Sequence, residues 1–134
     1  MKKVLAIIIL SMLPGCAAMN AYFMAKFDQN EYQLINDVRS LSQIGSEFCS
    51  NQQHMVPIVA RIYLKSLEFK NYAEFIPENT AAIKLSDSLI ELTAPLHNRY
   101  HGTEKISEAY CKQKMLILNK SATTIAQVIG SKPR

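Results

Sequence analysis

DQNEYQLINDVRSLSQIGSEFC, residues 28–49, is the stretch of sequence that decides the fold. Its apolar side chains recur every three or four positions, which is the period of one face of an α-helix. Asp28 and Glu31 have the spacing of a capping box, with aspartate in place of serine or threonine. The stretch predicts a helix that ends near Cys49 and whose buried face contains Leu34, Ile35, Val38, Leu41, Ile44 and Phe48.

Three further segments repeat this period and are separated by breaks at residues 50–53, 76–80 and 101–103. Their apolar positions are Val59, Ile62, Tyr63, Leu67 and the stem of Lys70; Ile83, Leu85, Leu89, Ile90, Leu92 and Leu96; and Ile106, Tyr110, Ile117, Leu118, Ile125 and Ile129. We find no alternating strand pattern, internal repeat or low-complexity tract. Four helices with short connections predict an all-α fold, a small antiparallel bundle that occupies residues 28–134.

Prolines and capping residues suggest where these helices begin and end. We expect Pro57 in the first turn of the second helix, where a missing N–H is tolerated. Pro95 is expected to kink or end the third helix. Thr103 or Ser107 is expected to cap the fourth helix, and Gly130 to end it.

Composition allows one domain in 134 residues and argues against disorder, since 49% of the residues are apolar and 19% are charged. The net charge of +4 is partly a property of the N-terminus. Removing Lys2 and Lys3 from the 15 basic residues leaves 13 against 11 acidic ones, a net charge of +2. No run of basic residues is interleaved with aromatic ones, so we expect no nucleic-acid binding.

The N-terminus has the three parts of an export signal. Lys2 and Lys3 supply the positive end, and an apolar run follows from Val4 to Leu13. Leu13-Pro14-Gly15-Cys16 follows at the position of the cleavage site, where a signal peptidase requires small residues. These features predict that the rest of the chain lies outside the cytoplasm.

At these positions the chain resembles the bacterial prolipoproteins, because Leu13, Gly15 and Cys16 match the defining positions of their processing motif. The resemblance implies diacylglycerol on the Cys16 thiol, cleavage before Cys16, and acylation of the new amino group, for example with palmitate. Residues 1–15 are then a signal peptide, and residues 16–27 a lipidated tether. Ala17, where an aspartate is associated with inner-membrane retention, implies the periplasmic face of the outer membrane. Pro14 departs from the motif, which puts the efficiency of processing in doubt.

An uncleaved membrane helix is the alternative for the same segment. Val4 to Ala25 contains only Ser11 and Asn20 as clearly polar residues and is long enough to span a bilayer. The two lysines would then keep the N-terminus inside, and the protein would be a single-span protein of the inner membrane. Simple secretion is the third possibility.

Two cysteines remain after Cys16 is assigned to lipid, and we expect them to form a disulfide. In an up-down-up-down bundle the first helix ends where the fourth begins. Cys49 and Cys111 therefore lie at the same end. Bridging them closes a loop of about 60 residues, which is worth roughly 4 kcal/mol in the chain-entropy model.

His97 and His101 are the candidate metal ligands, since four residues apart they share one helical face. Glu104 or Glu108 would complete a site for zinc or copper. The pair straddles a predicted helix end, where histidines also complement the helix dipole. We therefore expect a solvated helix end and no metal or other cofactor apart from the lipid.

No spacing pairs a nucleophile with a base, and we expect no enzyme. Asp87 and Glu91 share a helical face, a pattern typical of the wet side of an amphipathic helix. Four aromatic residues near the second connection belong either to the core or to a contact patch: Tyr63, Phe69, Tyr72 and Phe75. The sequence favours a module that binds another envelope protein, with a metal or small-ligand carrier and an envelope hydrolase as the alternatives.

Overall fold

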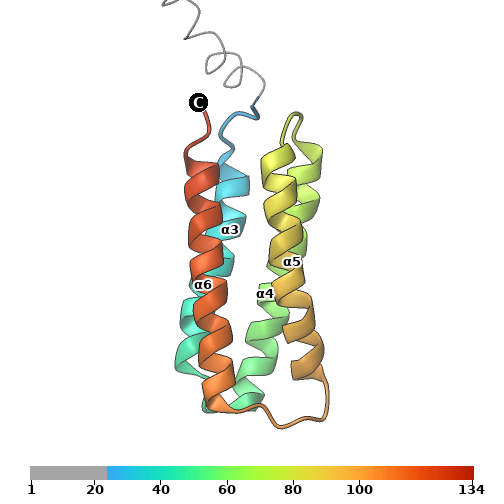
Figure 1. Cartoon of the computed structure of the whole chain (residues 1–134), viewed down its shortest axis with the longest axis vertical. Helices are drawn as coiled ribbons and strands as arrows, with labels where there is room; N and C mark the ends of the chain where they lie inside the picture. The colour runs from blue at the N-terminus through green and yellow to red at the C-terminus, as the bar shows by residue number, and fades with distance from the viewer. Residues whose placement is uncertain (1–23) are drawn as a thin grey trace, which may run out of the picture.

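The computed structural model describes residues 24–134, which form the four-helix antiparallel bundle expected from the sequence. The helices are α3 (Gln29–Glu47), α4 (Gln52–Phe75), α5 (Thr80–His101) and α6 (Glu108–Gly130). Figure 1 shows α6 beside α3 and α5 beside α4. The residues before α3, the residues after α6 and the α4–α5 connection lie together, at what we call the termini end. The other two connections lie at the opposite end, which we call the disulfide end.

Three of the four helices begin at a side-chain cap, which explains their starting points. The Asp28 carboxylate accepts hydrogen bonds from the backbone N–H groups of Asn30 and Glu31, both at 2.9 Å. Asn51 caps α4 and Ser107 caps α6 in the same way. Each cap satisfies N–H groups that have no partner inside the helix. Of the two residues expected to cap α6, Thr103 and Ser107, the cap is therefore Ser107.

Pro57 lies outside the first turn expected for it, and Pro95 lies inside α5 without ending it. Gln52 and Gln53, which we assigned to a break, are already helical, so Pro57 lies in the second turn of α4. Pro95 does not end α5, which continues to His101. Both prolines are exposed, so the carbonyl that each leaves unpaired four residues earlier lies where water reaches it.

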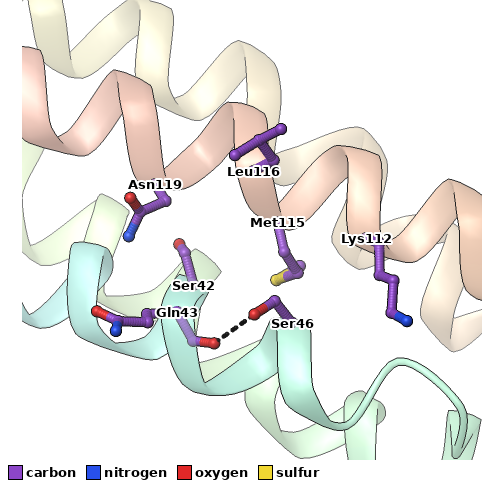
Figure 2. Close-up of a pocket in the computed structure, with 7 residues that line it drawn as sticks. All are labelled: Ser42, Gln43, Ser46, Lys112, Met115, Leu116 and Asn119. Carbon is purple, nitrogen blue, oxygen red and sulfur yellow. Dashed lines mark hydrogen bonds between the residues drawn. The ribbon is translucent and has the colours of Figure 1, made fainter.

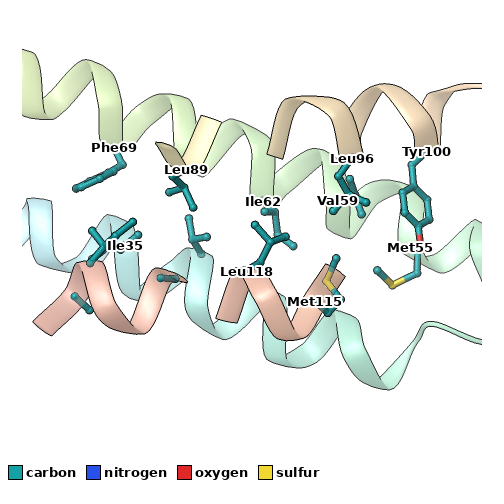
Figure 3. Packing of buried hydrophobic residues seen from close by; sticks show 14 of the residues in the cluster. Ile35, Met55, Val59, Ile62, Phe69, Leu89, Leu96, Tyr100, Met115 and Leu118 are labelled. Atoms are coloured by element: carbon teal, nitrogen blue, oxygen red, sulfur yellow. The ribbon is translucent and has the colours of Figure 1, made fainter. Parts of the chain in front are cut away.

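Every helix carries a row of buried positions in steps of four and three residues, the heptad seam of a coiled coil. Ala126 of α6 is also buried, beside this row. In chain order the seam positions are Glu31, Ile35, Val38, Ser42, Gly45 and Cys49; Met55, Val59, Ile62, Ser66, Phe69 and Ala73; Asn79, Ala82, Ser86, Leu89, Thr93, Leu96 and Tyr100; and Cys111, Met115, Leu118, Ala122, Ile125, Ile129 and Lys132. Figure 3 shows the larger of these side chains packing between the helices. The seam makes the core one continuous strip.

Small residues in the seam let the helices approach closely. A Cβ atom on Gly45 would lie 2.8 Å from the Met115 sulfur, so any larger residue there would require the Met115 side chain or the helices to shift. Ser42, Ser66 and Thr93 donate their hydroxyl protons to carbonyls four residues earlier in their own helices. Their polarity is thus satisfied without any bond between helices.

The seam corrects part of the expected buried face. Ile44 and Phe48 on α3 are exposed, as is Ile117 on α6. The spacing of apolar residues predicted that these side chains are buried. On α3 the buried heptad positions are occupied instead by the smaller Ser42 and Gly45. Large apolar side chains are therefore left on the surface.

A buried polar cluster closes the termini end. The Glu31 carboxylate accepts from Lys132 Nζ at 2.5 Å and from Asn79 Nδ2 at 2.6 Å. Asn79 Oδ1 in turn accepts from Lys132 Nζ at 2.6 Å. The three residues are 0%, 3% and 5% exposed for Glu31, Asn79 and Lys132. The capping-box interpretation of Glu31 is therefore wrong, because its carboxylate binds this cluster.

Residues just before α3 are fastened to the same end by the backbone. Ala25 N–H donates to the Glu78 carbonyl at 3.2 Å, and Phe27 N–H donates to the Pro133 carbonyl at 2.8 Å. Glu78 adopts a φ of 59°, in the left-handed region that glycine favours. Residues 24–27, which the sequence analysis assigned to a tether, thus include two that are bonded to the bundle.

Candidate functional site

A groove of about 470 Å³ lies between α3 and α6. Figure 2 shows its walls, formed by Ser42, Gln43 and Ser46 of α3 and by Lys112, Met115, Leu116 and Asn119 of α6. The lining combines hydroxyls, amides, one cation and two apolar side chains. Mixed linings of this kind suit a protein segment better than a purely apolar ligand.

Small polar residues on α3 create the groove. Ser42 and Ser46 direct their hydroxyls to carbonyls of their own helix and leave the space between the helices unfilled. Asn119 Nδ2 donates to the Arg39 carbonyl at 3.1 Å and closes the groove toward the termini end. The floor is Met115, whose thioether points from α6 toward α3 (Figure 2). None of these residues was expected to form a site, because no pattern in the sequence shows which helices will face each other.

Another, smaller groove of about 230 Å³ lies between α5 and α6, which contact each other less than the other neighbouring helices do. Its lining is more apolar and includes Leu85, Leu89, Leu92 and Ile125, with Ser88, Ser121 and Thr124 at its edges. The leucines of α5 face the short side chains of Ser121 and Thr124 on α6, so this side of the bundle is incompletely filled.

The disulfide expected from the sequence is present at the end opposite the termini. Cys49 and Cys111 are bonded, with their α-carbons 5.5 Å apart. The bridge closes a loop of 62 residues and joins the end of α3 to the first turn of α6. It therefore covalently fixes two helices that also pack against each other along their length.

His97 and His101 lie together, with ring centroids 4.1 Å apart and the ring planes tilted by 36°. Tyr63 of α4 stacks on His97, with ring centroids 4.6 Å apart. Neither expected third ligand joins them, since Glu104 pairs with Arg99 at 3.4 Å and Glu108 pairs with Lys112. In the described part of the chain, no three histidine, cysteine or acidic side chains come together in a way that suits a metal ion.

Two of the four acidic residues on α4 and α5, Glu68 and Asp87, are paired with lysines. Asp87 accepts from Lys70 at 2.5 Å, and this hydrogen bond raises the pKa of Lys70. A hydrogen bond from Lys65 to Glu68 raises the pKa of Lys65. Asp87 is thus half of an interhelical ion pair, as suits the wet side of the bundle. In the core, burial raises the pKa of Tyr100.

The four aromatic residues divide between core and surface. Phe69 is fully buried in the seam, and Tyr63 packs on His97. The Tyr72 hydroxyl donates to Asp28 at 3.2 Å and helps to hold the start of α3. Phe75 at the end of α4 is 88% exposed. The cluster is therefore neither one core nor one contact patch.

Cys16 and nearly all of the export signal lie outside the described residues. Within residues 24–134, no helix is both long and apolar enough to cross a bilayer. Comparison with protein-family models, with curated proteins and with solved structures finds no match to this chain.

Proposed function

We propose that this protein is an envelope lipoprotein, anchored through Cys16, whose helical bundle binds another envelope protein. It acts as an assembly, exclusion or inhibitory module and catalyses no reaction of its own. The anchor rests on the resemblance of Leu13, Gly15 and Cys16 to the prolipoprotein motif. The Cys49–Cys111 disulfide supports an oxidising compartment such as the periplasm.

The observation that carries the binding role is the exposure of large apolar side chains beside a concave surface. Leu116 and Ile117 are consecutive exposed residues on α6, and Leu116 also lines the α3–α6 groove. A rigid bundle gains no stability from such residues, whereas a partner that covers them removes apolar surface from water. The groove polar groups supply directional bonds to the same partner.

Acyl labelling of living cells tests the anchor. We expect a clickable fatty acid to mark the wild-type protein and to leave Cys16→Ser unmarked. Cys49→Ser is the matched control, since it also removes one cysteine but should keep the label. Mass spectrometry should find a mature chain that begins at Cys16. A chain that retains Met1, or equal labelling of Cys16→Ser, contradicts the lipoprotein assignment and favours the uncleaved anchor.

A further inference from the structure

Charge is unevenly distributed along the chain, and the imbalance falls on one helix. After Glu108 the sequence contains no aspartate or glutamate, while Lys112, Lys114, Lys120, Lys132 and Arg134 follow. Lys132 is buried in the polar cluster. Beyond the first turn of α6, every charged residue on its outer surface is therefore basic.

Two of these lysines flank the exposed leucine at the groove. Lys112, Leu116 and Lys120 are spaced by four residues and so form one row along α6. Leu116 is 54% exposed, and Lys112 and Leu116 both line the groove. Eight residues of helix separate the α-carbons of the two lysines by about 12 Å along the axis.

The cations beside the groove have one acidic partner between them. Lys112 lines the groove and pairs with Glu108, one turn below, and both side chains are more than half exposed. No ion pair involves Lys120 among the residues that the structure describes. The row of Lys112, Leu116 and Lys120 on α6 therefore carries a net positive charge.

We propose that the α3–α6 groove binds an acidic amphipathic helix of a partner protein, an inference that rests on the interaction role proposed above. An apolar side chain of that helix contacts Leu116 and Met115. Two carboxylates seven or eight residues apart pair with Lys112 and Lys120, since that spacing also spans about 12 Å. Gln43, Ser46 and Asn119 supply hydrogen bonds at the margins.

A membrane surface with anionic lipids is the competing occupant, and the shape of the groove disfavours it. A bilayer surface is flat on this scale and does not reach the floor of a groove between two helices. The side-chain amide of Gln43 and the amide oxygen of Asn119 would be covered without partners, which costs free energy for each group. A partner helix can insert side chains that form hydrogen bonds with these polar groups.

Site-specific photo-crosslinking in the native host tests the proposal. We place a photoreactive amino acid at Leu116 and, as a matched control, at Leu64 on α4, since these leucines are 54% and 55% exposed. Only the Leu116 position should give a protein adduct. Mass spectrometry of the linked peptide should find a net negative segment with acidic residues seven or eight positions apart.

Charge-reversed variants give the second readout. Lys112→Glu with Lys120→Glu should lower the adduct yield at position 116 by at least about tenfold, whereas Lys112→Arg with Lys120→Arg should retain it. Both lysines are exposed, so the melting temperature should stay close to that of the wild type and exclude a folding defect. Flotation of purified protein on phosphatidylglycerol vesicles tests the lipid alternative.

Several outcomes would overturn the inference. They are a neutral or basic linked peptide, equal adducts at both leucines, a lipid adduct alone, or insensitivity to charge reversal. An adduct only at Leu64 or at a third probe on Phe75 would remove the groove assignment and keep the interaction role. No adduct at any of the three positions would remove both.

Discussion

The two ends of the bundle are closed by different chemistry. At the disulfide end, one covalent bond between Cys49 and Cys111 joins α3 to α6. At the termini end, Glu31, Asn79 and Lys132 form a buried cluster. It joins the start of α3 and the start of α5 to Lys132, two residues after the end of α6. The covalent closure depends on an oxidant and tolerates imperfect packing. The polar closure needs no oxidant but requires all three groups together, because a lone buried charge is strongly destabilising.

Removing one charge from the termini end should have the largest effect. Lys132→Met leaves the Glu31 carboxylate buried without its cation, and we expect a loss of about 3–5 kcal/mol in the free energy of unfolding. Urea denaturation followed by circular dichroism measures it. The double variant Glu31→Leu with Lys132→Met should recover most of the loss, since no unpaired charge remains. A loss below about 1 kcal/mol in the single variant would show that this end is not closed by the ion pair.

Removing the disulfide should cost slightly less and act at one end only. For Cys49→Ser with Cys111→Ser we expect a loss of about 2–4 kcal/mol. Hydrogen exchange should accelerate at residues near the bridge, and the amides around Glu31 should stay protected up to global unfolding. Uniform acceleration along the chain would show that the two ends are not independent. Free thiols at both positions in periplasmic protein would show that the bond does not form in the cell.

Filling the closest helix contact should have an intermediate effect. In Gly45→Ala the new methyl group lies 2.8 Å from the Met115 sulfur, so the Met115 side chain must shift or α3 and α6 must separate one turn from the disulfide. We expect a loss of about 1–3 kcal/mol, partly offset by the higher helix propensity of alanine. Gly102→Ala is the control, because its nearest neighbour is at 3.4 Å. Equal melting temperatures for the two variants would contradict the close contact at Gly45.

The helix caps should give the smallest effects and still distinguish the ends. Asp28 accepts two backbone N–H bonds and the Tyr72 hydroxyl, whereas Ser107 accepts one backbone N–H. Asp28→Ala should therefore lower the free energy of unfolding by about 1–2 kcal/mol, and Ser107→Ala by about 0.5–1 kcal/mol. Thermal melts in the same buffer compare them. The reverse order would mean that the hydroxyl of Tyr72 adds nothing to the cap.

Much of the architecture could be predicted because it depends on local periodicity. The number of helices follows from the spacing of apolar residues, and the Cys49–Cys111 pairing follows from helix order. The exact buried face could not be predicted in this way. Ser42 and Gly45 are buried because close packing selects small residues there, while the more apolar Ile44 stays outside. The hydrophobicity of the residues alone does not show which positions of α3 pack closely against the other helices.

The polar cluster and the groove escaped sequence analysis for a related reason. Glu31 has a local interpretation as a capping residue, but its carboxylate binds Lys132, 101 residues later in the chain. No short-range pattern connects the two. The groove depends on the absence of side-chain volume at Ser42 and Ser46, which becomes visible only when α6 is placed beside α3.

The two backbone bonds before α3 determine how the bundle would carry mechanical load. A pull applied at Met24 is resisted first by the bond from Ala25 to Glu78 and then by the bond from Phe27 to Pro133. The force thus enters the α4–α5 connection and the C-terminal residues before it reaches the first turn of α3. Two anchoring points on separate segments also restrict swivelling about the attachment. With a lipid on Cys16, the eight residues up to Met24 would allow the start of the bundle to lie at most about 28 Å from the bilayer.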